Sequence, residues 1–260
     1  MITIDPNKTY LIDLDGTMYR GNQVIPEAVT FMQMLQKHHV NYVFVTNNAT
    51  RTAKQNLQHM ETLGFTNLKE SDFFTSAMAA VLYMKKHSDA RYVYAIGEAG
   101  LTEAIAKGGY ELDEQRAELV FVGLMHNADY SLYSKAARIL RQNHAILVGT
   151  NQDRRIPDGD AFSIGNGAII EMLKYASEAE TVMIGKPNSP MMEEVLSYVG
   201  KTKAECIMIG DNLETDIAFA KDNGLFSIMV CSGVHTKKDA LSFRVQSDEV
   251  IASLNELSIK

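Results

Sequence analysis

Short apolar runs alternate with longer amphipathic stretches along the whole chain. Runs such as YVFVT at 42–46 and CIMIG at 206–210 are apolar at successive positions, which is typical of parallel strands that helices cover on both faces. Runs of this kind predict strands at 9–14, 41–46, 91–96, 118–123, 145–149, 181–185, 205–209 and 225–230. Amphipathic periodicity predicts helices at 27–38, 53–63, 76–87, 131–143, 167–178, 190–199, 213–223 and 247–256. This alternation predicts an α/β fold with a doubly wound, Rossmann-like parallel sheet.

Candidate catalytic residues lie near both ends of the chain, before about residue 55 and after about residue 185. The middle of the chain carries its own alternation of strands and helices. We therefore expect two domains. The core is expected at 1–82 together with 182–260, and an inserted α/β domain is expected at 83–181.

Each predicted strand of the core ends in residues that can bind or react. Ligands of open α/β sheets bind beyond the carboxyl ends of the strands, so these residues are expected to meet at one edge. They are Asp13 and Asp15, Thr46 and Asn47, Lys186, and Asp211 with Asp216. An isolated Asp-x-Asp or Gly-Asp-Asn segment is usually a strand end or a turn. It is the repeated placement after apolar strands that indicates a functional site.

The acids at this edge would repel one another without a cation. Neighbouring carboxylates disfavour each other's charged form, and Mg²⁺ relieves this because it prefers carboxylate, phosphate and water oxygens. Lys186 and Thr46 would then hold a phosphoryl group, and Gly16 would let backbone N–H groups approach it. Of Asp13 and Asp15, one carboxylate can form an aspartyl-phosphate while the other transfers a proton.

Composition and charge argue against nucleic acid and membrane as binding partners. The 260 residues are 46% hydrophobic and 22% charged with a formal net charge of −7, whereas nucleic-acid-binding surfaces are usually basic. Cys206 and Cys231 lie in or beside apolar runs, and we expect two buried thiols in a reducing cytoplasm. We see no signal peptide in MITIDPNK at 1–8 and no run long enough to span a membrane. We expect a cytoplasmic protein that binds neither nucleic acid nor membrane.

The four polar segments resemble the motifs of the haloacid dehalogenase-like (HAD) superfamily of phosphohydrolases. DLDGT at 13–17, VTNN at 45–48, GKP at 185–187 and GDNLETD at 210–216 are similar to its first to fourth motifs. An insert between the second and third motifs resembles the subfamily with a large α/β cap, subfamily IIA with a C2-type cap. TNNATRT, VGTNQD, MIGKPNSP and GDNLETDI resemble the NagD and p-nitrophenyl phosphatase-like branch, a likeness that covers nearly the whole chain.

The resemblance implies a role for each matching residue. Asp13 would be the nucleophile and a Mg²⁺ ligand, and Asp15 would be the general acid/base with its backbone carbonyl on the metal. Asp211 would be the third protein contact to Mg²⁺, and Asp216 would support the metal shell. The remaining implied roles concern phosphate: Thr46 and Lys186 would bind the phosphoryl group and Asn47 would supply a backbone N–H.

The inserted domain is expected to select the leaving group, and its size favours small phosphomonoesters such as sugar phosphates, nucleoside monophosphates and p-nitrophenyl phosphate. Asn151 and Asp153 follow a predicted cap strand, as do Arg154 and Arg155, so they are candidates for substrate contact. Loop capping or solvated charge explains them equally well. His126 follows another cap strand, and a structural role is favoured for it. The resemblance also implies a homodimer formed through the cap.

The segments of the cap and second motif depart from the family pattern at two positions. Relatives often carry proline at the position of Gln152 and serine at that of Ala49, which bears on substrate preference rather than on the chemistry.

Three other functions compete with hydrolysis. A phosphosugar transferase or mutase keeps the same acids and is separated poorly by sequence. A phosphometabolite-sensing, non-catalytic HAD protein is disfavoured because the acid set is intact. Dehalogenation is disfavoured by Asp15, the second acid of the first motif.

Overall fold

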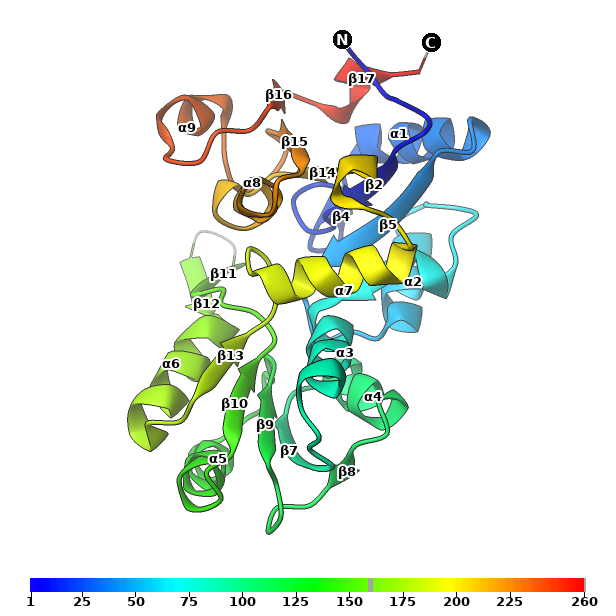
Figure 1. Cartoon of the computed structure of the whole chain (residues 1–260). Helices are drawn as coiled ribbons and strands as arrows, with labels where there is room; N and C mark the ends of the chain where they lie inside the picture. Colours follow the sequence, from blue (N-terminus) through cyan, green and yellow to red (C-terminus); the bar gives the residue numbers. More distant parts are fainter. Residues whose placement is uncertain (159–160, 260) are drawn as a thin grey trace. The chain divides into compact units, whose positions relative to one another are not determined.

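A computed structural model of the chain describes residues 1–158 and 161–259 (Figure 1). The chain folds as two compact units. The first contains Met1–Thr46, Ala53–Phe74 and Val195–Lys260, and the second contains Asn47–Thr52 and Thr75–Glu194. The second unit takes in the insert expected at 83–181 together with flanking residues on both sides.

The first unit is built on a six-stranded sheet in the order β16-β15-β14-β2-β5-β6. In that order the strands are Glu249–Ile251, Phe226–Val230, Cys206–Gly210, Thr9–Ile12, Asn41–Thr46 and Phe73–Thr75. From β16 to β5 each strand runs parallel to its neighbour. Two short strand pairs accompany the sheet: β1 (Ile2–Thr3) with β17 (Leu257–Ser258), and β3 (Tyr19–Arg20) with β4 (Gln23–Val24).

Helices flank this sheet in the sequence. They are α1 (Pro26–Lys37), α2 (Ala53–Thr62), α8 (Ala218–Asn223) and α9 (Lys237–Ser242), while α7 (Ser189–Val199) contains residues of both units. Short 3₁₀ helices lie at Glu70–Asp72, Lys203–Glu205 and Leu254–Glu256, and a π-helix lies at Leu213–Ile217. The π-helix directly follows the fourth motif strand, β14.

The sheet of the first unit is apolar on both faces, as the sequence predicts. On β15, Ile228 and Val230 belong to one buried cluster, which includes Phe31 of α1. Met229, which points the other way, packs in a second cluster with Leu213. Successive side chains of a strand face opposite sides, so each face of this sheet has its own core.

The second unit is built on a five-stranded parallel sheet in the order β13-β10-β9-β7-β8. In that order the strands are Thr181–Met183, Ile146–Gly149, Leu119–Val122, Tyr92–Ile96 and Glu111–Leu112. Its helices are α3 (Ser76–His87), α4 (Ala99–Lys107), α5 (Tyr130–Gln142) and α6 (Asn166–Ser177). An antiparallel pair, β11 (Arg155–Asp158) and β12 (Ala161–Ile164), precedes α6.

The helix predicted at 247–256 is wrong. This stretch contains β16 and a 3₁₀ turn instead. The Asp248 carboxylate accepts hydrogen bonds from the backbone N–H and hydroxyl of Ser227, at 2.8 and 2.9 Å, and pairs with Lys221 at 2.7 Å. These bonds tie the segment to β15, so a tertiary contact overrides the helical period. The sequence predicted no element at α4 or α9, both of which are short.

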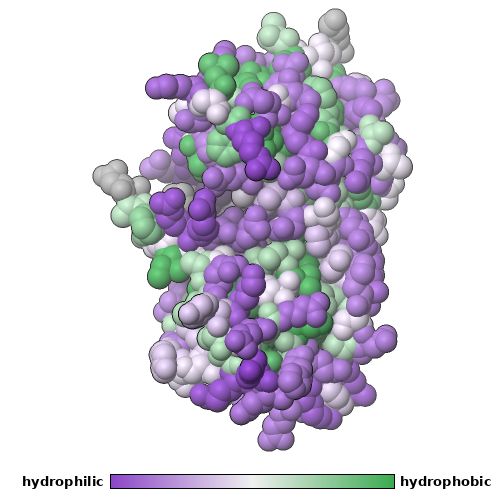
Figure 2. Space-filling view, turned by 60° about the vertical axis from the view of Figure 1, so that its left-hand side comes forward, coloured by the Kyte–Doolittle hydropathy of each residue, from purple (hydrophilic) through white to green (hydrophobic). Residues whose placement is uncertain are grey.

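The molecular surface and the two cysteines bear on the expected location of the protein. The face seen in Figure 2 is largely hydrophilic, with hydrophobic side chains in smaller patches. Within residues 1–158 and 161–259, no helix combines the length and apolar character needed to cross a membrane. Cys206 is buried, Cys231 is partly buried, and both are free thiols. Burial raises the pKa of Cys206 to about 11. The cytoplasmic location stays a prediction.

Candidate active site

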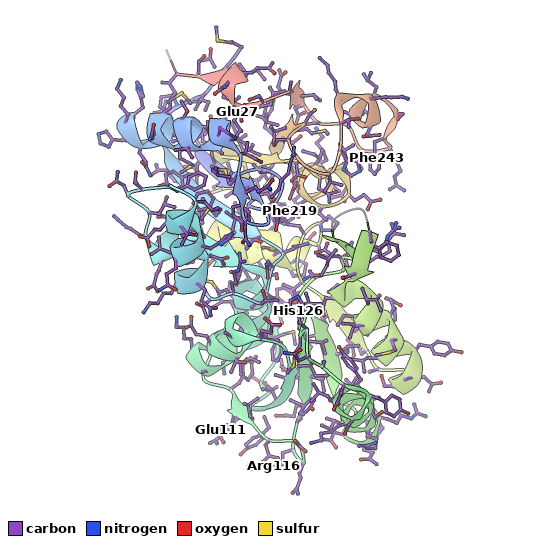
Figure 3. All side chains as sticks on the ribbon, turned by 180° about the vertical axis from the view of Figure 1, so that it is seen from behind. Glu27, Glu111, Arg116, His126, Phe219 and Phe243 are labelled. Atoms are coloured by element: carbon purple, nitrogen blue, oxygen red, sulfur yellow. The ribbon has the colours of Figure 1, made fainter. Side chains whose placement is uncertain are left out.

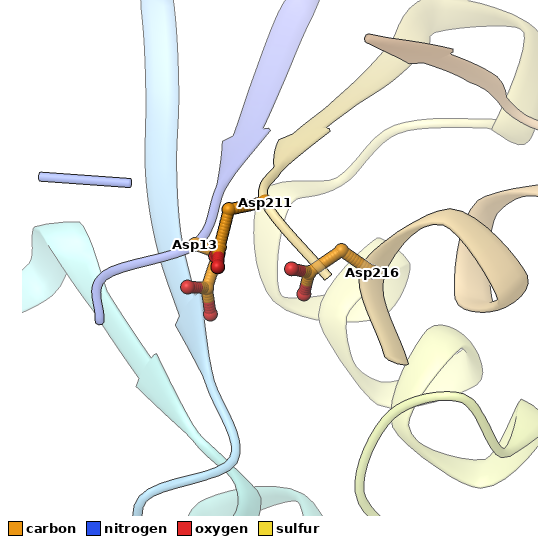
Figure 4. A group of neighbouring side chains, drawn as sticks. All are labelled: Asp13, Asp211 and Asp216. Carbon is orange, nitrogen blue, oxygen red and sulfur yellow. The ribbon is translucent and has the colours of Figure 1, made fainter. Parts of the chain in front are cut away.

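Three carboxylates converge in the first unit, one from the first motif and two from the fourth (Figure 4). Asp13 follows β2, Asp211 follows β14, and Asp216 lies in the π-helix. One oxygen from each lies within 4.8 Å of the others, and the residues are only 8, 1 and 1% exposed. Negative charges that are this close together and this deeply buried repel one another strongly unless a cation compensates them.

The pairing of β2 with β14 places the first two acids together. The strands run parallel with Ile12 opposite Ile209, and the backbone N–H of Asp13 donates to the Ile209 carbonyl at 2.9 Å. Both strands therefore end at the same level, so Asp13 and Asp211 share one edge. Thr46 is buried at the end of β5, the neighbour of β2 on its other side, and it lies at that edge as well.

Asp211 is enclosed by two loops that approach it through glycines. A Cβ on Gly16, whose φ is +93°, or on Gly233 would overlap the Asp211 carboxylate. The carboxylate also accepts hydrogen bonds, from the Val234 N–H at 2.6 Å and the Thr17 hydroxyl at 3.3 Å. These contacts fix the direction of the carboxylate. No local sequence signal marks the 233–234 loop as part of the site, because it carries no reactive side chain.

Asp216 is held by the start of the π-helix. Its carboxylate accepts from the N–H of Asn212 at 3.1 Å, and the Asn212 side chain accepts from the N–H of Glu214 at 2.9 Å. The Leu213 N–H donates to Nδ1 of His235 at 3.1 Å. A π-helical turn is unusual and often occurs at functional sites. Here it turns the Asp216 side chain back toward the end of β14.

This donor set suits a hard divalent cation. All three groups of the cluster are carboxylates, without histidine or cysteine, and oxygen-only ligands are those that Mg²⁺ prefers. Asp15 is not a member of the cluster. That cluster is defined by side-chain oxygens, so the role of the Asp15 backbone carbonyl as a metal ligand stays a prediction.

Asp15 is exposed, in contrast to Asp13 two residues before it. Its carboxylate accepts from the N–H of Gly21 at 3.4 Å, and its backbone forms an isolated bridge with Tyr19. The short β3–β4 pair thus follows it directly. The two carboxyls of this motif therefore lie in different environments, one buried and one exposed.

Four other predicted site residues lie in the second unit: Asn47, Asn151, Asp153 and Lys186. Lys186 is 1% exposed, and a lysine buried this deeply is normally paired. The Asn47 side-chain amide donates to the Lys186 carbonyl at 3.0 Å and to the Asp153 carboxylate at 3.3 Å. The Asn151 amide donates to the Asn47 carbonyl at 2.9 Å. The structure thus brings these four residues together.

The other polar residues of the cap segment have separate contacts. Arg155 lies over the ring of Phe162, 5.3 Å from its centroid. The Gln152 side chain accepts from the Asn188 amide at 3.3 Å. Arg155 and Gln152 thus each have a contact within the protein, and a contact of Arg155 with substrate stays a prediction.

His126 pairs with Glu98, a residue that no sequence motif marks. The two are joined by the ring Nδ1 and a Glu98 oxygen at 2.6 Å, and the His126 backbone N–H donates to the same oxygen at 3.1 Å. Burial raises the pKa of the Glu98 carboxyl, but the hydrogen bonds from His126 outweigh it and hold that pKa below its usual range. His126 lies after β9 (Figure 3), and the pair joins the ends of β7 and β9.

Family models match both ends of the chain. The model described as haloacid dehalogenase-like hydrolase matches residues 10–111, and a HAD-hydrolase-like model matches 183–257. The 5'-nucleotidase YutF of Bacillus subtilis (strain 168) is 34% identical over 249 residues, which are 96% of this chain and 96% of that protein. An acid sugar phosphatase of Staphylococcus saprophyticus is 33% identical over 251 residues, again 96% of each chain.

Solved structures resemble the fold over almost its whole length. A double mutant of the thermostable NPPase from Geobacillus stearothermophilus has a TM-score of 0.90 and 34% identity, with 98% of this chain and 99% of that one covered. NagD from E. coli K-12 has a TM-score of 0.89 and 26% identity, with 97% and 99% covered. These likenesses confirm the predicted α/β fold class.

Proposed function

The chain belongs to the haloacid dehalogenase-like hydrolases, in the branch with NagD and the p-nitrophenyl phosphatases, and on that premise we propose that it is a Mg²⁺-dependent phosphatase of small phosphomonoesters. The observation that carries this proposal is the buried cluster of Asp13, Asp211 and Asp216. Relatives named 5'-nucleotidase and acid sugar phosphatase support a phosphoric monoester as the substrate.

The three clustered acids would hold Mg²⁺. The carboxylate oxygens match the ligand preference of Mg²⁺. Because their negative charges are buried together, binding of a divalent cation is favourable. When bound, Mg²⁺ offsets the charge that the carboxylates and the substrate phosphate bring together.

Hydrolysis proceeds in two steps on the chain's own acids. First, a carboxylate oxygen of Asp13 attacks phosphorus, and the bond between phosphorus and the ester oxygen breaks. Asp15 enters this step protonated and gives its proton to the departing oxygen, so an alcohol leaves. Next, Asp15 takes a proton from water as the water oxygen attacks the aspartyl-phosphate. The bond from phosphorus to Asp13 breaks, which releases inorganic phosphate and regenerates Asp13 as a carboxylate and Asp15 as an acid.

The phosphoryl oxygens need donors as charge shifts between the ester and Asp13. We assign this role to the Thr46 hydroxyl, the Lys186 ammonium and the backbone N–H of Asn47. The N–H of Gly16, which the sequence suggested as a further donor, donates to the Tyr19 carbonyl at 2.7 Å instead. Preorganised donors of this kind stabilise the transition state because they do not have to reorient during the reaction. The burial of Thr46 and Lys186 supports the assignment, since it limits competition from water.

The second unit supplies the selectivity for the leaving group. The expected substrates are sugar phosphates, nucleoside monophosphates and p-nitrophenyl phosphate. Asn151 would influence this choice from the segment after β10. The names of the relatives, a nucleotidase and a sugar phosphatase, support a range of leaving groups within this branch.

Phosphate release from a panel of small esters, with and without Mg²⁺, tests the proposal. The panel contains p-nitrophenyl phosphate, hexose phosphates, glycerol phosphate and nucleoside monophosphates. We expect metal-dependent release by the wild type and none by Asp13→Asn, which lacks the nucleophile. Asp15→Asn should lose at least about a hundredfold in turnover, because general acid–base catalysis contributes that much.

The outcome also separates the competing functions. Release that stays equal in Asp13→Asn would contradict the aspartyl-phosphate mechanism. Folded, Mg²⁺-loaded wild type that hydrolyses none of the esters would overturn the phosphatase proposal. Transfer of phosphate to a sugar acceptor without hydrolysis would then identify a mutase, and tight binding without turnover would identify a sensor.

We also propose a homodimer formed through the second unit. Apolar side chains are exposed there in two successive elements: Phe162 and Ile164 of β12 are 60 and 65% exposed, and Tyr175 of α6 is 90% exposed. Light scattering on the purified chain should give about twice the monomer mass of 28.9 kDa, and Tyr175→Glu should reduce it. A monomer at micromolar concentrations would rule the dimer out.

A further inference from the structure

The side-chain amide of Asn47 joins two segments that are far apart in the sequence. Its nitrogen lies 3.0 Å from the Lys186 carbonyl oxygen and 3.3 and 3.4 Å from the two Asp153 carboxylate oxygens. A primary amide has two N–H donors. One is directed to the main chain at Lys186 and the other to the Asp153 carboxylate, so both are used.

The orientation of this amide is fixed by its surroundings. Both groups that face its nitrogen are acceptors, so a flipped amide would place oxygen against oxygen. On the other side, the Asn47 Oδ1 lies close to Gly185, where a Cβ would come within 2.7 Å of it. Only glycine leaves room for the amide here. This oxygen is buried and accepts no hydrogen bond from the described residues.

The backbone of Asn47 is held as firmly as its side chain. Its carbonyl accepts from the Asn151 amide at 2.9 Å and from the Ser76 hydroxyl at 2.7 Å. Asn151 in turn accepts the N–H of Asp153 at 3.2 Å through its own side-chain oxygen. The segment 151–153 therefore hydrogen-bonds to Asn47 at two places, its backbone carbonyl and its side-chain amide.

Resting on the proposed function, we infer that Asp153 is a positioning residue that orients the Asn47 amide, which then holds the main chain of the phosphate-binding Lys186. A hydrogen bond to a charged carboxylate is stronger than a neutral one. The carboxylate of Asp153 is engaged in this contact, and an acid in direct contact with a phosphate dianion would repel it. The segment predicted to touch substrate thus acts through Asn47 instead.

The first test is a pair of single variants assayed for turnover and for binding of inorganic phosphate. Asp153→Ala frees the Asn47 amide, so the Lys186 ammonium loses its fixed position. We expect kcat to fall about tenfold to a hundredfold, the range for a misplacement of about 1 Å. Phosphate affinity should fall with it. Mg²⁺ affinity should not change, because the carboxylate cluster belongs to the other unit.

Asp89→Ala is the matched control. It removes an exposed aspartate of the same unit and should leave kcat, KM and phosphate affinity as in the wild type. Thermal unfolding of each variant separates a folding defect from a displaced lysine.

A double-mutant cycle tests the pair itself. Asn47→Asp sets a carboxylate against the Asp153 carboxylate and the Lys186 carbonyl, three acceptors without a donor. Adding Asp153→Asn restores one donor, so the double variant should recover about tenfold of the kcat that Asn47→Asp loses, as expected for contacting residues. Additive losses would show that the two side chains do not act together and would overturn the inference.

Two further results distinguish this inference from the proposed function. A rise in KM alone, with kcat and phosphate affinity unchanged in Asp153→Ala, would place Asp153 on the leaving group and overturn a positioning role. If the wild type hydrolyses no ester yet binds inorganic phosphate more tightly than Asp153→Ala, the proposed function fails while the positioning role stands.

Discussion

At the scale of single residues, the geometry of the carboxylate cluster depends on glycines, which have no side chain, as much as on the acids themselves. Asp211 can be buried at the end of β14 because glycines at 16 and 233 leave room for its carboxylate. The N–H of Val234 then reaches it at 2.6 Å. Such outer contacts orient metal ligands and affect metal affinity strongly.

Gly233→Ala tests this close approach. The added Cβ would overlap the Asp211 carboxylate, so Mg²⁺ affinity should fall by at least about tenfold. Isothermal titration with Mg²⁺ measures the change directly.

Gly200→Ala is the control for that substitution. Gly200 has a φ of +63° with no atom within 4 Å of an added Cβ, so the variant should lose about 1–2 kcal/mol of stability but keep Mg²⁺ affinity. Unchanged Mg²⁺ binding in Gly233→Ala would show that the loop yields without moving Asp211.

At the scale of elements, the far edge of the first sheet depends on a cluster at Asp248. Burial raises the pKa of this carboxyl, but the Lys221 ammonium and the Ser227 hydrogen bonds hold it below its usual range. Since the folded-state pKa is the lower one, the group stabilises the fold above its unfolded value, near 3.9. That stability is lost as the pH falls through the folded-state pKa.

Asp248→Asn should therefore reduce stability at neutral pH by about 1 kcal/mol, a hydrogen-bond scale that allows for solvent screening. The difference from the wild type should shrink below about pH 4 as Asp248 becomes protonated. Urea unfolding at neutral and acidic pH measures both. Glu249→Gln, at an exposed neighbour in β16, should show little effect, and an equal loss there would assign the effect to net charge.

Particular elements show what the sequence can and cannot predict. The strand ends at Asp13 and Asp211 were predictable, because an apolar run and an acid are both local features. The helix predicted at 247–256 was wrong because the Asp248 carboxylate is bound by Ser227 and Lys221, which lie 21 and 27 positions away in the sequence. The loop at 233–234 could not be found, since its contribution is a backbone N–H and an absent Cβ. The Asn47–Asp153 contact spans 106 positions and has no local signal.

At the scale of the whole molecule, the candidate residues divide between the two units. The carboxylate cluster is confined to the first unit, whereas Asn47 and Lys186 belong to the second. A ligand that binds the native state stabilises the regions that it orders. Mg²⁺ and phosphate should therefore protect different parts of the chain.

Hydrogen exchange measures this division. With Mg²⁺ alone, we expect slower exchange at 13–17, 210–217 and 232–235, and no change in the strands β7, β9 and β10. Adding inorganic phosphate should extend protection to the segments around Asn47 and Lys186. Protection by Mg²⁺ alone across β7, β9 and β10 would contradict the confinement of the metal site to the first unit.

The strand order of the first unit has a consequence for synthesis of the chain. β2 lies between β5 and β14, and β14 begins at residue 206. On the ribosome, one side of β2 therefore has no partner until roughly 200 more residues emerge, about 10–40 s at ordinary rates of translation. Throughout that interval a largely apolar strand exposes unpaired backbone groups, with which strands of other chains can pair. Slower expression, or a chaperone that binds the nascent chain, should therefore raise the yield of folded protein. In the folded sheet β2 is paired on both sides, so this risk of aggregation exists only during synthesis.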